Sequence, residues 1–135
     1  MEHRITQNAG PRPVALVVDD NVEVCVTLEA ILEDAGYEVV TAYSEEAAVR
    51  SLPAGGKLDL LVADVTLRNG NGASLAKRVL EARPETTIIL MSGWSTVDES
   101  TFPPGARFLR KPFRTEQLLE AIKLAEGAKK SGSGA

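Results

Sequence analysis

Short apolar runs alternate with amphipathic segments along most of the chain, and this alternation restricts the possible folds more than any other feature. The first run is VALVV at residues 14–18, and similar runs recur at 59–64 and 87–92. Runs that are apolar at nearly every position are typical of strands buried on both faces. Helices between such strands join them into a parallel sheet. The pattern therefore predicts a layered α/β fold.

Five strands and four main helices follow from this pattern. The predicted strands cover residues 14–18, 37–42, 59–64, 87–92 and 106–109. The predicted helices cover residues 21–36, 44–52, 72–83 and 115–127. Ser44 and Thr115 are the predicted N-caps of the second and last of these helices, and Gly36 is the predicted stop of the first. Right-handed crossovers then give a doubly wound five-stranded sheet.

Composition narrows the class of protein. A chain of 135 residues with 44% hydrophobic and 25% charged residues is typical of one globular domain. The net charge of −4 disfavours binding to nucleic acid or to an anionic membrane by this domain. The single cysteine, Cys25, has helical spacing to apolar neighbours and is expected to be buried and unreactive. No segment has the length of a membrane span, and we expect a cytoplasmic protein.

The two ends of the chain differ from its centre. Residues 1–13 are polar, contain Gly and Pro, and are expected to form a disordered leader or linker. Residues 14–126 form the predicted domain, and residues 127–135 (GAKKSGSGA) are expected to form a flexible tail.

Polar and charged residues follow the predicted strands. Asp19 and Asp20 follow the first strand, Asp64 ends the third, Ser92 ends the fourth, and Lys111 follows the fifth. Sites in open parallel sheets lie at the carboxyl ends of the strands, so these side chains are expected to converge. Each residue alone has a simpler explanation, such as a helix cap or a solvated lysine. Together they indicate a functional site.

The carboxylates Asp19, Asp20 and Asp64 repel one another, so their convergence requires a balancing cation. Oxygen ligands without His or Cys favour Mg²⁺, which retains water and binds one or two carboxylates beside a phosphate oxygen. A carboxylate beside Mg²⁺ suggests phosphoryl transfer onto that carboxylate. The chain has neither a G-x-x-x-x-G-K nor a G-x-G-x-x-G motif, which disfavours nucleotide binding.

Four motifs, VVDD (17–20), LLVADVTL (60–67), LMSG (90–93) and FLRKPF (108–113), resemble in order the motifs of response regulator receiver domains. The resemblance spans residues 14 to about 126 and implies the flavodoxin-like strand order 2-1-3-4-5. It also implies that the domain accepts a phosphoryl group from a phosphohistidine on a histidine kinase or donor domain. Such a domain would catalyse its own phosphorylation and dephosphorylation, without independent substrate turnover.

The resemblance assigns roles around the metal. Asp64 would be the phosphoacceptor and a metal ligand, Asp20 would bind Mg²⁺ directly, and Asp19 would bind it mainly through water. The backbone carbonyl of Thr66 would be a further ligand.

The resemblance also assigns roles around the phosphoryl group. Ser92 would hydrogen-bond to it, Lys111 would pair with it, and Phe108 would be the aromatic switch residue. The Lys111–Pro112 bond matches a position that is often cis in the family. Trp94 follows Gly93 at the rim of the site. We expect its ring to be partly exposed there and to slow hydrolysis of the aspartyl phosphate, although an isolated Trp is usually a core residue.

Several positions depart from the family. Arg68 replaces a common Pro, so a more mobile loop is expected after Asp64. Phe108 has no hydroxyl, so the switch would act by packing. The segment between Ser92 and Lys111 is short and contains Pro103–Pro104, which predicts a shortened or irregular fourth helix.

Alternatives remain open at this stage. The chain is either a stand-alone receiver or the receiver segment of a larger protein such as a hybrid histidine kinase. A receiver-like interaction module that never carries phosphate is the competing class, and the complete charged set argues against it. The chain lacks the phosphate-binding loop that a flavodoxin-type cofactor binder needs. It is also too short for the cap domain that a metal-dependent acyl-phosphate hydrolase of similar topology needs. The sequence does not identify the downstream target.

Overall fold

The apolar run at residues 14–18 forms β1 (Val14–Val18), which lies between β2 (Glu38–Ala42) and β3 (Leu60–Asp64). The structure is a computed structural model that describes residues 11–52, 56–93 and 97–134. Trp94 therefore lies outside the described residues, as does most of the expected leader. β1 is buried at four of its five positions, as its continuous apolar sequence predicts.

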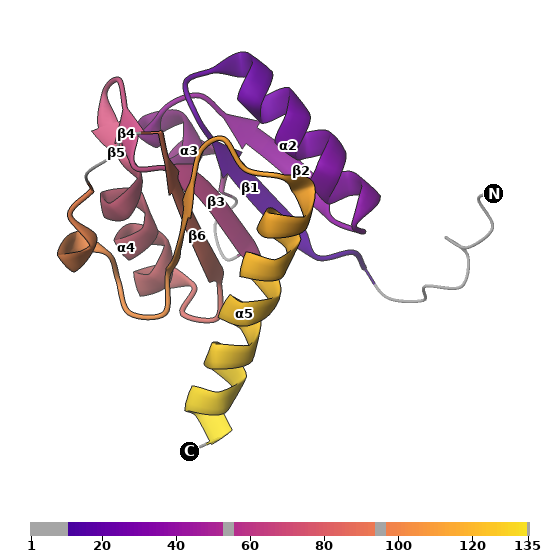
Figure 1. The fold of residues 1–135 in the computed structure, drawn as a ribbon. Coiled ribbons are helices and arrows are strands. Elements are labelled where there is room, and N and C mark those ends of the chain that lie inside the picture. Colours follow the sequence, from indigo (N-terminus) through magenta and orange to yellow (C-terminus); the bar gives the residue numbers. More distant parts are fainter. Residues whose placement is uncertain (1–10, 53–55, 94–96, 135) are drawn as a thin grey trace.

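The helices and the remaining strands complete the described fold (Figure 1). The remaining strands are β4 (Thr66–Leu67), β5 (Gly70–Asn71), β6 (Thr87–Ser92) and β7 (Arg107–Arg110). The helices are α2 (Val22–Asp34), α3 (Glu45–Ser51), α4 (Gly72–Ala82), the 3-10 helix η1 (Glu99–Thr101) and α5 (Thr115–Gly134).

The main sheet has the order β2-β1-β3-β6-β7, and all four of its strand pairs are parallel. Counting only its five strands along the chain, this order is 2-1-3-4-5 and confirms the predicted flavodoxin-like topology. The register places Asp64 opposite Met91 and Ser92 opposite Arg110. The carboxyl ends of the central strands are therefore level with one another.

Alternate residues of each strand face two separate cores. Leu16 and Val18 pack with Ala48 of α3 and Leu75 of α4 on one face of the sheet. The opposite core contains the following residues: Ala15 and Val17 of β1, Cys25 and Leu28 of α2, and Leu118 of α5. Helices thus cover both faces, and the expected burial of Cys25 is confirmed.

The segment between β6 and β7 is irregular, as the two prolines predict. Within the described residues 97–106 the only helix is η1, a single 3-10 turn capped by the Asp98 side chain. Phe102 and Ala106 pack against the core that α3 and α4 cover.

Three features differ from the sequence analysis. Residues 66–71 form a short antiparallel hairpin, β4–β5, rather than an open loop. The backbone of α5 continues as a helix to Gly134, into the part of the chain from residue 127 where a flexible tail is expected. Thr115, the expected N-cap, is instead the first residue of α5. The N–H of Arg114, the residue before the helix, donates to the Gln117 side chain at 2.7 Å.

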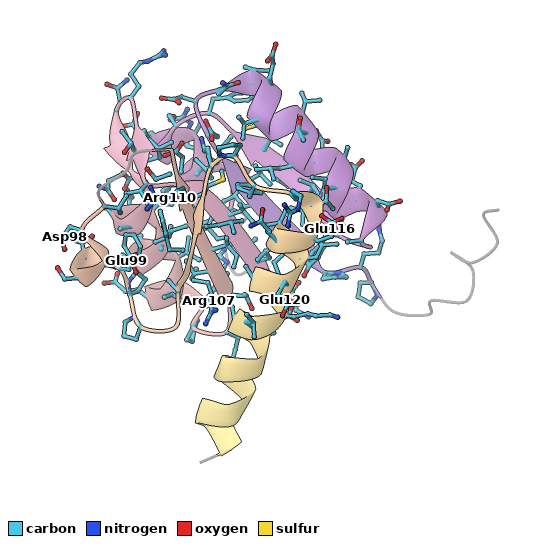
Figure 2. All side chains as sticks on the ribbon, viewed as in Figure 1. Asp98, Glu99, Arg107, Arg110, Glu116 and Glu120 are labelled. Atoms are coloured by element: carbon cyan, nitrogen blue, oxygen red, sulfur yellow. The ribbon has the colours of Figure 1, made fainter. Side chains whose placement is uncertain are left out.

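The edge strand β7 carries the exposed arginines Arg107 and Arg110 (Figure 2). The acidic residues Asp98 and Glu99 precede this strand, and Glu116 and Glu120 follow it on α5. Charged side chains on an edge disfavour pairing with a strand of another chain. Among the described residues, no helix is both long enough and apolar enough to cross a membrane.

Candidate functional site

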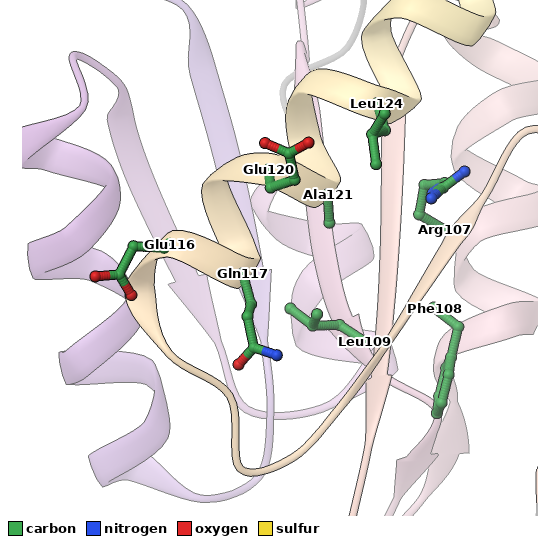
Figure 3. A pocket seen from close by; sticks show the side chains of 8 residues that line it. All are labelled: Arg107, Phe108, Leu109, Glu116, Gln117, Glu120, Ala121 and Leu124. Carbon is green, nitrogen blue, oxygen red and sulfur yellow. The ribbon is translucent and has the colours of Figure 1, made fainter.

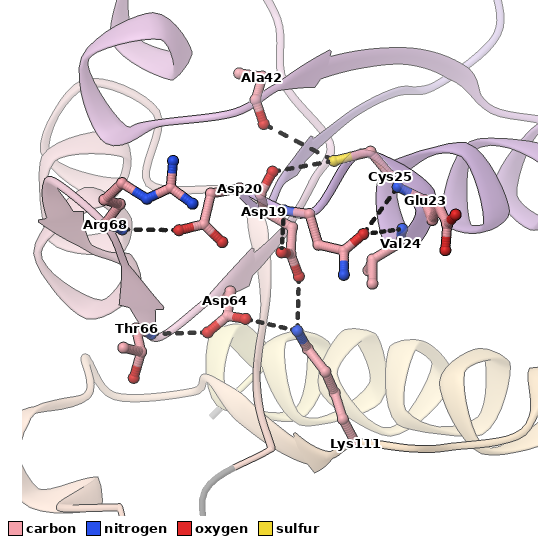
Figure 4. A network of polar contacts seen from close by, with 11 residues as sticks. Asp19, Asp20, Glu23, Val24, Cys25, Ala42, Asp64, Thr66, Arg68 and Lys111 are labelled. Carbon is pink, nitrogen blue, oxygen red and sulfur yellow. Dashed lines mark hydrogen bonds and ion pairs between the residues drawn. The ribbon is translucent and has the colours of Figure 1, made fainter.

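The ends of β1 and β3 bring two carboxylates onto one ammonium group (Figure 4). Lys111 Nζ donates to Asp19 Oδ2 at 2.7 Å and to Asp64 Oδ2 at 2.6 Å. The second oxygens are also bound: Asp19 Oδ1 accepts from the Asn21 N–H at 2.8 Å, and Asp64 Oδ1 accepts from the Thr66 N–H at 2.7 Å. The three charged groups therefore form one connected and oriented cluster.

Burial makes this cluster electrostatically strong. The side chain of Asp19 is 1% exposed, that of Asp64 is 10% exposed, and that of Lys111 is 23% exposed. Burial raises the pKa of Asp64 above its usual range, although the hydrogen bonds from Lys111 and Thr66 oppose the shift. Burial alone lowers the pKa of Lys111, but the bonds to Asp19 and Asp64 outweigh it, and the net pKa is raised. Lys111 is therefore cationic at neutral pH.

Backbone contacts fix the positions of these side chains. The Asp19 N–H donates to the Ala42 carbonyl at 3.2 Å, which ties the end of β1 to β2. The Lys111 N–H donates to the Ser92 carbonyl at 2.9 Å and holds the residue after β7 beside the end of β6. The Lys111–Pro112 peptide bond is cis, in line with the resemblance.

Asp20 is directed to a different partner. Its Oδ2 accepts from the Arg68 N–H in the β4–β5 hairpin at 2.9 Å. The hairpin also contains Thr66, whose N–H binds Asp64. The structure therefore brings Asp19, Asp64 and Lys111 into direct contact and places Asp20 beside them through the hairpin.

The predicted phosphoryl-binding and switch residues lie on β6 and β7. Ser92 is fully buried at the end of β6, and Gly93 follows it, with an added Cβ at ordinary contact distance, 3.9 Å, from Lys111 Cβ. Phe108 is half-buried, and its ring centroid lies 6.0 Å from that of Phe102. Ser92 thus borders the cluster, and Phe108 lies in β7, three residues before Lys111.

Gly72 is a functional position that the sequence analysis missed. A Cβ added there would lie 2.3 Å from the backbone oxygen of Asp64, which no side chain can tolerate. Asn71 before it is the N-cap of α4 and accepts from the Ala73 and Ser74 N–H groups. An Asn preceding a periodic segment is a recognisable cap signal, whereas the close approach of Gly72 depends on the tertiary fold.

The donor set fits Mg²⁺ through the Asp19–Asp64 pair. Mg²⁺ needs only one or two carboxylates, and water completes its shell. In the described part of the chain, no three Asp, Glu, His or Cys side chains are grouped as metal ligands. Asp20 does not share the ammonium that joins Asp19 and Asp64. To bind the metal, the Asp20 carboxylate must either keep its hydrogen bond to the Arg68 N–H while one oxygen contacts Mg²⁺, or give up that hydrogen bond.

Comparison with known proteins identifies the class. Residues 15–123 match the response regulator receiver domain family. The chain belongs to this family, whose members accept phosphoryl groups in two-component signalling. Receiver domains interact with histidine kinases and, as a family, bind Mg²⁺.

Two curated relatives illustrate the similarity. The transcriptional regulatory protein DltR of Streptococcus agalactiae is 35% identical over 112 residues, which is 81% of this chain and 50% of DltR. ZraR of Salmonella typhimurium is 31% identical over 113 residues, which is 82% of this chain and 25% of ZraR. The chain thus spans half or less of the length of these relatives.

Solved structures agree with the fold. A response regulator receiver protein from Sinorhizobium medicae has a TM-score of 0.80 and 28% identity, over 87% of this chain and 97% of that one. A response regulator from Burkholderia pseudomallei, with a phosphorylated aspartic acid, calcium ion and citrate, has a TM-score of 0.73 and 25% identity. That match covers 90% of this chain and 72% of the other.

Proposed function

We propose that Asp64 is the phosphoacceptor of this receiver domain and that a phosphohistidine on a partner kinase or donor domain is its substrate. The observation that carries the proposal is the 2.6 Å bond between Asp64 and Lys111 at the carboxyl edge of the sheet. In this proposal the Asp64 carboxylate, whose side chain is 10% exposed, is the nucleophile, and its contact with the Lys111 ammonium supports that role. The phosphorylated aspartate of the Burkholderia relative supports the same chemistry.

The transfer forms a P–O bond to an Asp64 carboxylate oxygen while the P–N bond to the donor imidazole breaks. Lys111 balances negative charge on the transferred group, and the Thr66 N–H holds the acceptor carboxylate in a fixed orientation. Mg²⁺, which Asp20, Asp64 and the Thr66 carbonyl would hold directly and Asp19 mainly through water, would neutralise charge on the phosphoryl oxygens. Attack of water on the acyl phosphate returns Asp64 to its free form.

Ser92 and Lys111 share the conformational response. A hydrogen bond to a charged group contributes roughly 1.5–3 kcal/mol, whereas a complete two-state switch needs about 5.5 kcal/mol of differential binding. Ser92 alone is therefore insufficient. Phe108 is the proposed readout, because its half-buried ring packs beside Phe102, with ring centroids 6.0 Å apart. The residue also borders a groove of about 450 Å³ between β7 and α5, although its ring points away from α5 (Figure 3).

Phosphorylation of the purified chain tests the assignment of Asp64. Acetyl phosphate with Mg²⁺ is expected to add one phosphoryl group to the wild type and none to Asp64→Asn. Asp34→Asn is a matched control, because Asp34 is exposed at the end of α2, away from the cluster. Incorporation into Asp64→Asn at the wild-type level would exclude Asp64. An unmodified wild type would favour the phosphorylation-independent interaction module.

The kind of protein that contains this domain is also a matter for proposal. The curated relatives that it matches are named transcriptional regulators, and the chain covers half or less of each. Any nucleic-acid contact of such a protein is assigned to parts outside residues 14–126. A stand-alone receiver and a segment of a hybrid histidine kinase are the other arrangements, and the length of the intact gene distinguishes them.

A further inference from the structure

Glu45, on α3, contacts the element that follows the phosphoacceptor. Its Oε1 accepts from the Asn71 N–H at 3.0 Å, and its Oε2 accepts from Ser74 Oγ at 3.1 Å. The same Oε2 pairs with the Arg78 guanidinium at 3.2 Å. One carboxylate thus binds the N-cap residue and the first two turns of α4.

Glu45 is more deeply placed than a typical surface acid. Its side chain is only 13% exposed, whereas the neighbouring Glu46 side chain is 88% exposed. A Cβ added at Gly70 would lie 2.7 Å from both Glu45 Cβ and Oε1. The backbone of the hairpin therefore packs directly on the Glu45 side chain, and only glycine permits this approach.

The hairpin transmits this contact to the site. Asn71, which Glu45 binds, pairs with Thr66 across the hairpin, and Gly70 pairs with Leu67. The Thr66 N–H in turn binds Asp64 Oδ1 at 2.7 Å. A short path of backbone contacts therefore connects Glu45 with the phosphoacceptor carboxylate.

Two carboxylates hold the hairpin, and they differ in one respect. Asp20 holds its turn through the Arg68 N–H at 2.9 Å, but Asp20 is also an assigned metal ligand. Glu45 has no role at the metal, so its hold on the hairpin is independent of what Asp20 binds. Glu45 therefore fixes a loop that lacks the Pro common in the family, because Arg68 stands at that position.

We propose that Glu45 is a positioning residue that fixes the β4–β5 hairpin, and through it Thr66, against Asp64. The inference rests on the proposed function of Asp64 and adds a residue on α3 to the phosphorylation machinery. Groups that hydrogen-bond directly to metal ligands commonly change metal affinity by about 10- to 100-fold when they are removed. Glu45 is one step further away, because it acts through the Asn71–Thr66 pair, so its effect on Mg²⁺ binding is expected at the lower end of this range.

The test is a Mg²⁺ titration of the ¹⁵N-labelled full chain, read from the amide signals of Thr66 and Arg68. Glu45→Ala is expected to weaken Mg²⁺ affinity by up to about tenfold and to speed hydrogen exchange at the Asn71 amide, which loses its bond to Glu45. Glu45→Gln retains an oxygen for the Asn71 N–H and should restore most of the affinity. The half-exposed ion pair with Arg78, which Gln loses, contributes little.

Glu46→Ala is the matched control, because Glu46 is the adjacent acid on the same helix and its ion pair with Arg50, at 4.0 Å, is exposed. Gly70→Ala is a second variant that displaces Glu45 without changing any charge, and it should reproduce the loss of affinity. Urea unfolding without Mg²⁺ shows whether each variant is folded.

The outcomes separate the two proposals. A wild type that responds to Mg²⁺ and a Glu45→Ala variant with the same midpoint would overturn the positioning role only. Equal loss in Glu45→Ala and Glu45→Gln would also overturn it, since the retained hydrogen bond would then have no effect. A wild type without any Mg²⁺ response would overturn the proposed metal-dependent function, and with it the positioning role.

Discussion

The ionised carboxyl group of Asp64 costs the fold stability, because burial raises its pKa above the ordinary value of 3.8. An acid whose pKa is higher in the folded state than in the unfolded state binds its proton more tightly when folded. The free energy of unfolding therefore falls as pH rises from below 3.8 through the raised folded value. Lys111 reduces this cost without removing it.

Asp64→Asn is accordingly expected to be more stable than the wild type at neutral pH, because asparagine carries no buried charge. The gain should disappear as the pH falls below 3.8, where Asp64 is protonated in both states. Urea midpoints at neutral and acidic pH measure it, with Asp34→Asn as the exposed control. A lower midpoint for Asp64→Asn at neutral pH would show that the bond to Lys111 outweighs burial.

At the scale of elements, the segment between β6 and β7 is the least regular part of the described fold. Residues 97–106 contain one 3-10 turn, and its backbone bonds are few, such as Thr101 N–H to Asp98 carbonyl at 3.2 Å. Amides protected by so few bonds exchange through small local openings. Amide exchange there is expected to be faster than at Leu28 of α2 or Leu118 of α5, both fully buried. Equally slow exchange by NMR would contradict this.

Elements with local signals were predictable from the sequence. The strand bounds of β1 and β6 match the predicted 14–18 and 87–92, because each run is apolar along its length. Asp64 and Lys111 were predictable as site residues because the ends of parallel strands meet at one edge. The parallel order alone is enough to bring them together across 47 residues of sequence.

The hairpin and its contact with α3 were not predictable in the same way. The partners of Glu45 lie 26 to 33 residues away, and a Glu in the first turn of a helix already has a local explanation in the helix dipole. Residues 66–71 have no apolar run that would indicate strands. The hairpin backbone donates to the carboxylates of Asp20 and Glu45, and these side chains come near it only in the folded chain.

At the scale of the whole molecule, the proposed function requires a surface beside Asp64 on which a phosphohistidine donor can dock, and the rim that α2 and the segment after β7 form is the proposed surface. A groove of about 400 Å³ lies there, lined by Val24 and Leu28 of α2 together with Lys111 and Phe113. Lys111 both lines this groove and binds Asp64, so the groove is continuous with the site. We assign this rim to the donor domain.

Thr27, an exposed residue of α2 that lines this groove, makes the assignment testable. Thr27→Asp is expected to slow transfer from a cognate histidine kinase by about tenfold or more, since a charge buried without a partner under a bound donor opposes docking. Phosphorylation by acetyl phosphate should not change, because that donor needs no protein contact. Val26→Asp is the matched control, because Val26 is on the same helix and 58% exposed but does not line the groove. Equal slowing by Thr27→Asp and Val26→Asp, or slowing with acetyl phosphate as well, would place the donor elsewhere.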